Sequence, residues 1–294
     1  MSLGDDPSDE IDWSKLHFSP NPHDEANDLD RFWQIAANYQ DLKKQARSNP
    51  EIPLENLKHM AIEGILRRTL RTIRHYRRKT RLVREPWSLN SGGGDIALQE
   101  TLENITQRPD FQAEDVIVQV RREKPLDLVL MIDTSLSMNG RKIALCAVGA
   151  AVLAFLLRAD QYSIVAFGST ARVLKPLHKS LTPAQTIEVI LEAPMLGYTN
   201  IDEALRKGKT ELDKGRSAQK VGVILTDGKF TVGNDPQAAA ALYRRLEVMM
   251  TVDHNMDRDC CYQLARAGKG KVTEVKRYRH LPDRMLSLIR ALQQ

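Results

Sequence analysis

The spacing of hydrophobic residues changes about one third of the way along the chain. Before residue 112, apolar residues recur at helical spacing over residues 29–46 and 54–80, which predicts two helices. Beyond that point, short apolar runs alternate with longer amphipathic segments, as strands alternate with helices. Such alternation favours a mostly parallel sheet with helices on both faces. We therefore predict a doubly wound α/β fold preceded by a smaller α-helical N-terminal region.

The individual elements can be placed from the same pattern. Predicted strands cover residues 116–121, 126–132, 162–167, 171–174, 221–226, 246–252 and 271–275. Predicted helices cover residues 98–105, 143–157, 182–191, 201–212, 236–245, 260–267 and 281–292. Thr182 precedes Pro183, an arrangement typical of a helix N-cap. The stretch 143–157 carries no charge but is shorter than the roughly 20 residues of a membrane span, so we expect a buried helix.

Proline, glycine and charge divide the chain into two regions. Pro86 and the run Ser91–Gly94 mark a connector. We assign residues 1–112 to an acidic tail and a helical region with a basic helix and this Gly-rich connector, and residues 113–294 to the α/β domain. The net charge of +5 is unevenly spread, because residues 1–30 hold nine acids and one base, whereas residues 67–84 hold nine bases and no acid.

The N-terminus and the cysteines indicate a cytoplasmic protein. The first residues are acidic and lack the basic start and apolar core of a signal peptide. Three cysteines form an odd set without a CxxC pair, which favours a reducing compartment. Asp253, His254, Asp257, Asp259, Cys260 and Cys261 cluster in the sequence. We interpret Asp257 or Asp259 as a helix cap rather than a metal ligand.

Oxygen-bearing side chains follow three of the predicted elements. Asp133, Ser135 and Ser137 alternate after the strand 126–132, so they can converge on one point. Thr199 stands just before the helix 201–212, and Asp227 follows the strand 221–226. Ligands of doubly wound sheets gather at the carboxyl ends of strands. Such hard oxygens favour Mg²⁺, with Ca²⁺ or Mn²⁺ as alternatives, over zinc.

The segments DTSLS, GYTN and LTDG, in that order, resemble the metal-ion-dependent adhesion site (MIDAS) of the von Willebrand factor A (VWA) domain. The resemblance covers residues 115–294. It implies that Ser135, Ser137 and Thr199 contact Mg²⁺, that Asp133 and Asp227 act directly or through water, and that a partner's carboxylate completes the coordination. Leu136 stands where many members have glycine, which puts the loop shape in question more than metal binding.

The details resemble intracellular bacterial VWA proteins that work with MoxR-type AAA+ ATPases. These include the carbon-monoxide-dehydrogenase accessory (CoxE-like) type and the D subunit of magnesium chelatase. The resemblance implies a chaperone-like adaptor, not an enzyme, whose partners are an AAA+ ATPase and a client protein that offers an acidic residue. The chain has no Walker motif, so nucleotide hydrolysis would come from the partner.

Two other functions remain open at this point. The first is a Mg²⁺-dependent phosphatase that uses Asp133, although Ser135 occupies the place where haloacid-dehalogenase phosphatases usually carry a second acid. The second, weaker alternative is nucleic-acid binding through the helix Arg67–Arg84. That run contains one aromatic residue, Tyr76, and no known reading motif. We therefore rank its pairing with acidic groups of the chain or of a partner above nucleic acid.

Overall fold

The computed structural model describes residues 25–48, 53–76, 80–88, 94–107, 110, 112–122, 124–135, 140–195, 197–252 and 256–293. Within these residues a six-stranded sheet has the order β6-β5-β4-β7-β8-β9. Its strands are β4 (Leu126–Asp133), β5 (Tyr162–Phe167), β6 (Ala171–Lys175), β7 (Gln219–Thr226), β8 (Leu246–Thr251) and β9 (Val272–Val275). Only the edge strand β6 is antiparallel to its neighbour. The predicted doubly wound, mostly parallel fold is confirmed.

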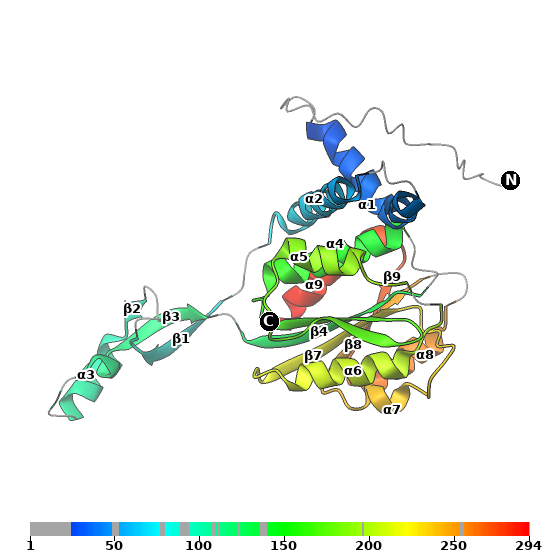
Figure 1. Cartoon of the computed structure of the whole chain (residues 1–294). Coiled ribbons are helices and arrows are strands. Elements are labelled where there is room, and N and C mark those ends of the chain that lie inside the picture. The colour runs from blue at the N-terminus through cyan, green and yellow to red at the C-terminus, as the bar shows by residue number, and fades with distance from the viewer. Residues whose placement is uncertain are drawn as a thin grey trace.

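Helices cover both faces of the sheet (Figure 1). One face carries α4 (Arg141–Leu156), α5 (Pro183–Leu191) and α9 (Leu281–Leu292), and the other carries α6 (Ile201–Asp213), α7 (Gln237–Ala240) and α8 (Arg258–Ala267). The central strand β4 alternates between them, with Leu130 in the hydrophobic cluster of the first face and Val129 in that of the second. Burial on both faces explains why β4 reads as a continuous apolar run.

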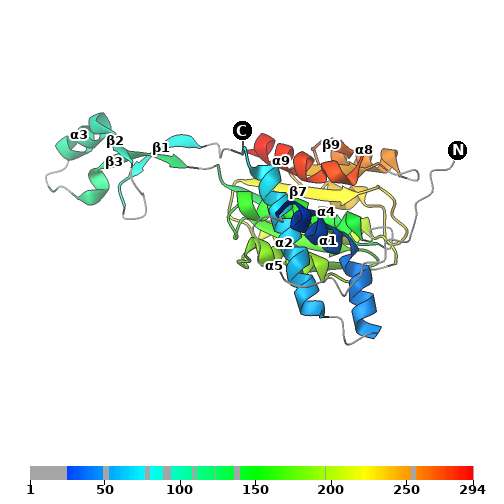
Figure 2. The ribbon, with the colours of Figure 1, turned by 90° about the horizontal axis from the view of Figure 1, so that it is seen from above.

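Two N-terminal helices, α1 (Glu25–Ser48) and α2 (Leu54–Ile73), form a further layer over α4 and α5 (Figures 1 and 2). Trp33, Tyr39 and Leu57 belong to the same hydrophobic cluster as α4. Gln40 Nε2 donates to Leu191 O at 2.6 Å, which joins α1 to the end of α5. These helices therefore share a core with the sheet. The division at residues 112 and 113 stays a prediction.

A second, smaller sheet forms an arm that projects from the main body (Figures 1 and 2). We use "arm" for β1 (Arg81–Pro86), β2 (Asp95–Ile96), α3 (Leu98–Gln107), the 3₁₀ turn η3 (Ala113–Asp115) and β3 (Ile117–Arg122). The strands are antiparallel in the order β1-β3-β2. The predicted strand 116–121 is present as β3, and it pairs within the arm rather than with the main sheet.

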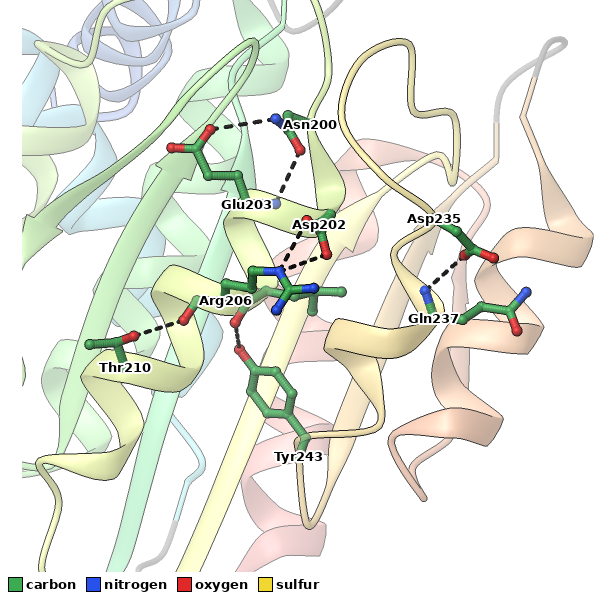
Figure 3. Close-up of polar contacts among 9 residues, drawn as sticks. Asn200, Asp202, Glu203, Arg206, Thr210, Asp235, Gln237 and Tyr243 are labelled. Atoms are coloured by element: carbon green, nitrogen blue, oxygen red, sulfur yellow. Dashed lines mark hydrogen bonds and ion pairs between the residues drawn. The ribbon is translucent and has the colours of Figure 1, made fainter.

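Two helices are shorter in the structure than the sequence predicts. The helix predicted to reach residue 80 ends at Ile73, and the unpredicted strand β1 follows because it pairs with β3 along its whole length. The helix predicted over 236–245 is limited to α7, since the chain turns to bring Tyr243 under α6, where its hydroxyl donates to Leu205 O at 2.6 Å (Figure 3).

The N-cap residues of helices were predicted more accurately than the lengths of helices. Thr182 caps α5, because its hydroxyl accepts from Gln185 N at 3.2 Å. Asp257 caps α8 by accepting from Cys260 N at 2.9 Å, as one of the two predicted alternatives. Among the described residues, none of the helices combines the length and apolar composition needed to cross a bilayer.

Candidate functional site at the carboxyl edge of the sheet

The site forms where two neighbouring parallel strands end. Ile132 of β4 lies beside Leu225 of β7, so Asp133, the last residue of β4, and Asp227, just after β7, leave the sheet at the same edge. On its other side Asp133 lies beside Phe167, the last residue of β5. The chain passes from β4 to β5 on one side and returns to β7 on the other. This is the switch point at which doubly wound sheets bind ligands.

Asp133 and Ser135 are held by alternating contacts. Asp133 is 4% exposed, and one of its carboxylate oxygens accepts from Ser135 N at 2.8 Å. The intervening Thr134 turns to β5, where its backbone N and its hydroxyl both donate to Phe167 O, at 2.7 and 3.0 Å. The predicted alternation of Asp133 and Ser135 against Thr134 is therefore present, and the buried Thr134 anchors the strand exit to β5.

Thr199 reaches this edge through hydrogen bonds to two other segments. Its neighbour Asn200 donates from its backbone N to Gly168 O at 2.7 Å, directly after β5. Thr199 N donates to Thr231 Oγ1 at 3.0 Å, and Thr231 N donates to Thr199 O at 2.9 Å. The Asn200 side chain caps α6 by accepting from Glu203 N at 3.1 Å (Figure 3). Thr199 is thus tied to the exits of both β5 and β7.

Asp227 sits on a tight turn that is joined to α8. One of its carboxylate oxygens accepts from Lys229 N at 2.9 Å, and its carbonyl accepts from Asp257 N at 2.9 Å. Gly228 has φ +84, and a Cβ at this position would collide with Asp257 O. A side chain here would meet both backbone strain and a steric clash. The glycine of LTDG is therefore required by the close approach of the α8 cap.

Burial and a neighbouring carboxylate both disfavour the charged form of Asp133. Burial, and to a smaller extent the negative charge of Asp227, raises the pKa of Asp133 to about 6, although hydrogen bonds from Ser135 and the charge of Lys142 act in the opposite direction. Tyr278 lies close enough that Asp133 and Asp227 contribute to raising its pKa, after the larger effect of burial. Lys142 Nζ lies 5.1 Å from the centre of the Tyr278 ring.

The structure brings four of the five predicted ligands to one edge: Asp133, Ser135, Thr199 and Asp227. Ser137 and Leu136 lie outside the described residues. Sequence reasoning missed Thr231, Lys142 and Tyr278. Nothing in the local pattern identifies Thr231, because its bonds to Thr199 join residues 32 positions apart.

Other candidate groups have structural partners. In the part of the chain that the structure describes, no three or more His, Cys, Asp or Glu side chains group as a metal site; Asp253 and His254 lie outside it. Cys260 and Cys261 are free and buried, and burial raises the pKa of each thiol to about 12. In the basic run, Arg67 donates from Nε to Glu63 at 2.9 Å, and the Arg68 guanidinium lies 4.2 Å from the Trp33 ring centre.

Comparisons with known proteins agree with this fold. A "von Willebrand factor type A from Catenulispora acidiphila" is 19% identical, with 60% of this chain and 44% of that chain covered and a TM-score of 0.50. A structure of proximal thread matrix protein 1 from the mussel byssus "with zinc occupied MIDAS motif" is 18% identical, covering 58% and 48%, also with a TM-score of 0.50.

The chain spans less than half the length of these two solved proteins, and at such identity the likeness concerns the fold alone. No curated protein matches the sequence. Residues 128–229, which run from β4 through Asp227, match the family model of the von Willebrand factor type A domain. Over these residues the chain is therefore similar to the von Willebrand factor type A domain.

Proposed function

We propose that this protein is a metal-dependent protein-binding adaptor. Asp133, Ser135, Ser137, Thr199 and Asp227 would hold a divalent cation at the carboxyl edge of the sheet, and an Asp or Glu of a partner would complete its coordination. The observation that carries the proposal is the buried carboxylate of Asp133, which lies close to the carboxylate of Asp227 and to Ser135 at the carboxyl edge of the sheet.

The donor set fits such an ion. Hydroxyl and carboxylate oxygens are the ligands of hard cations, and Mg²⁺ prefers six oxygen ligands in near-octahedral geometry. A bound cation would relieve the repulsion that Asp227 exerts on buried Asp133. The two carboxylates balance the charge of a divalent ion but do not fill its coordination sites. A partner's carboxylate can therefore still bind as a further ligand. We expect Mg²⁺ to be the physiological ion, with Ca²⁺ and Mn²⁺ as alternatives.

The resemblance to bacterial adaptors supplies the proposed partners. We infer that the chain works in the cytoplasm with a MoxR-type AAA+ ATPase in the maturation, activation or remodelling of a client, for example a metalloenzyme. Its part is to bind and present rather than to catalyse. The layer formed by α1 and α2 would offer a second contact surface, separate from the metal edge.

Calorimetric titration of Mg²⁺ against the full chain tests the metal site. We expect binding by the wild type and loss of binding in Asp133→Ala and Asp227→Ala, because each removes a carboxylate ligand. Asp259→Ala is the matched control, since Asp259 is an exposed acid on α8. Equal Mg²⁺ affinities of the wild type and Asp133→Ala in this titration would contradict the proposal.

Partner capture is tested by a pull-down with and without chelator, repeated with Asp133→Ala. We expect the same proteins to be lost on chelation and in the variant, while the folded state persists. Hydrolysis of a generic aryl phosphate by the wild type, abolished in Asp133→Asn, would instead support the phosphatase. Steeply salt-dependent nucleic-acid binding that persists in Asp133→Ala would support a role for the basic helix.

A further inference from the structure

Two exposed aromatic side chains border the candidate metal site. Tyr198 is 62% exposed and Phe230 is 39% exposed. Each directly precedes one member of the hydrogen-bonded pair Thr199 and Thr231. The two aromatic residues therefore lie on neighbouring loops at the same edge as Asp133 and Asp227. Tyrosine and phenylalanine in such positions are typical of protein–protein contacts, where they contribute large apolar areas.

The backbones that carry these aromatic residues are fixed. Thr199 O accepts from Thr231 N at 2.9 Å and from Val232 N at 3.3 Å, and Asn200 N donates to Gly168 O at 2.7 Å. Gly233, with φ +92, lies so close to the Asn200 amide that a Cβ would collide with it. We use "rim" for the two loops that carry Tyr198 and Phe230. Binding at this rim would require little further ordering of the loops, and preorganisation of this kind increases affinity.

The charges at the rim fit an acidic partner segment. Lys229 stands between Asp227 and Phe230 on the same turn, and its backbone N is bonded to the Asp227 carboxylate. A cation at the site together with the Lys229 ammonium would attract a carboxylate. A carboxylate alone distinguishes poorly between proteins, because most protein surfaces carry Asp and Glu. Selectivity must come from what stands beside the acid, and here the neighbouring surface is aromatic.

We propose that Tyr198 and Phe230 select partner segments in which the metal-bound Asp or Glu is flanked by an aromatic or large aliphatic residue. This inference rests on the proposed metal-dependent function and adds the chemistry of the recognised segment. The carboxylate provides the ligand for the ion, and the adjacent apolar side chain buries surface against the two rings. A segment with glycine beside the acid would keep the first contact and lose the second.

The test uses the full chain, saturating MgCl₂ and two fluorescent, C-terminally amidated pentapeptides, Gly-Phe-Asp-Phe-Gly and Gly-Gly-Asp-Gly-Gly, whose binding is followed by anisotropy. We expect the wild type to bind the aromatic peptide about tenfold more tightly, which corresponds to about 1.4 kcal/mol. Tyr198→Ala and Phe230→Ala should each remove most of this preference while Mg²⁺ affinity stays unchanged. The amidated peptide Gly-Phe-Asn-Phe-Gly should not bind, because it has no carboxylate.

Leu242→Ala is the matched control, because Leu242 is also exposed but precedes β8 at the opposite edge of the sheet. It should leave both peptide affinities unchanged. If Mg²⁺ binds but the two peptides bind equally or not at all, the inference is overturned while the metal site stands. Loss of Mg²⁺ binding in Tyr198→Ala or Phe230→Ala would assign the rings a structural role. Absence of Mg²⁺ binding by the wild type would overturn both proposals.

Discussion

All eight residues of β4 are buried, whereas β1 in the arm leaves Leu82 63% exposed, and α3 leaves Leu98 66% exposed. The main sheet lies between two layers of helices, so both faces of its strands are covered. In the arm, the buried apolar side chains of the described residues are Ala97, Val118 and Val120. The difference indicates that the sheet provides a rigid scaffold for the polar edge, while the arm presents apolar surface.

Matched valine truncations give the largest expected contrast. Val129 in β4 and Val120 in β3 are both buried, but only Val129 lies within a core closed by helices on both sides. We expect Val129→Ala to lower the free energy of unfolding by about 3 kcal/mol through lost burial and a cavity, and Val120→Ala to lower it by about 1 kcal/mol. Urea unfolding of each variant measures both values. Equal losses would contradict the comparison.

A glycine substitution at the carboxyl edge of the sheet should have the next largest effect. Gly228→Ala places a residue with a Cβ at a backbone φ of +84, and this Cβ would collide with Asp257 O. We therefore expect the free energy of unfolding to fall by about 2 kcal/mol, as measured by thermal unfolding. Gly149→Ala in α4 is the control, because its Cβ would lie 3.7 Å from the nearest atom, a side-chain carbon of Leu281, which is ordinary contact. Alanine favours helix there. A Gly228→Ala protein as stable as the wild type would refute the role of this turn.

A pH effect should come from the sheet rather than from the arm. Lys175 in β6 is fully buried, its Nζ donates to Ala159 O at 2.7 Å and to Tyr162 O at 2.6 Å, and burial lowers its pKa to about 8. The unfolded lysine keeps its proton up to about pH 10.4. Between these pH values the unfolded state binds more protons, so stability should rise with pH by about 2 to 3 kcal/mol.

Denaturant unfolding from pH 7 to 10.5, with Lys175→Met as the reference, isolates this contribution. Below about pH 7 both states are protonated and the full desolvation cost of Lys175 is present, so the difference between the two proteins should be constant there. The cations of the arm are more exposed, as in the ion pairs Arg84–Glu100 and Arg122–Glu85. If the free energy of unfolding of Lys175→Met rises with pH by the same amount, groups other than Lys175 cause the effect.

The smallest effect is expected on the surface of the arm. Leu102 on α3 is 52% exposed, and we expect Leu102→Gln to change stability by less than about 0.5 kcal/mol. Differential scanning calorimetry checks this value. A loss above 2 kcal/mol would show that this side chain is covered in the folded chain, and the contrast between arm and sheet would then be smaller.

Most elements of the sheet region could be predicted because their signals are local. The apolar run before Asp133 and the threonine before Pro183 specify a strand and a cap within a few residues. The arm was predicted less well, since the basic residues after Ile73 suit a helix, and only pairing with β3 places residues 81–86 in a strand. Local propensity was overridden there by contacts with residues more than 30 positions away.

The sequence by itself determined where the oxygen-bearing side chains of the proposed site stand along the chain and that Asp133 and Asp227 follow buried strands. Tertiary structure decided that β4 lies between β5 and β7, that Thr231 is bonded to Thr199, and that Lys142 and Tyr278 stand beside the carboxylates. The physical reason is that strand order and loop-to-loop hydrogen bonds depend on packing between distant segments. A local pattern of residue types does not specify which distant segments of the chain pack together.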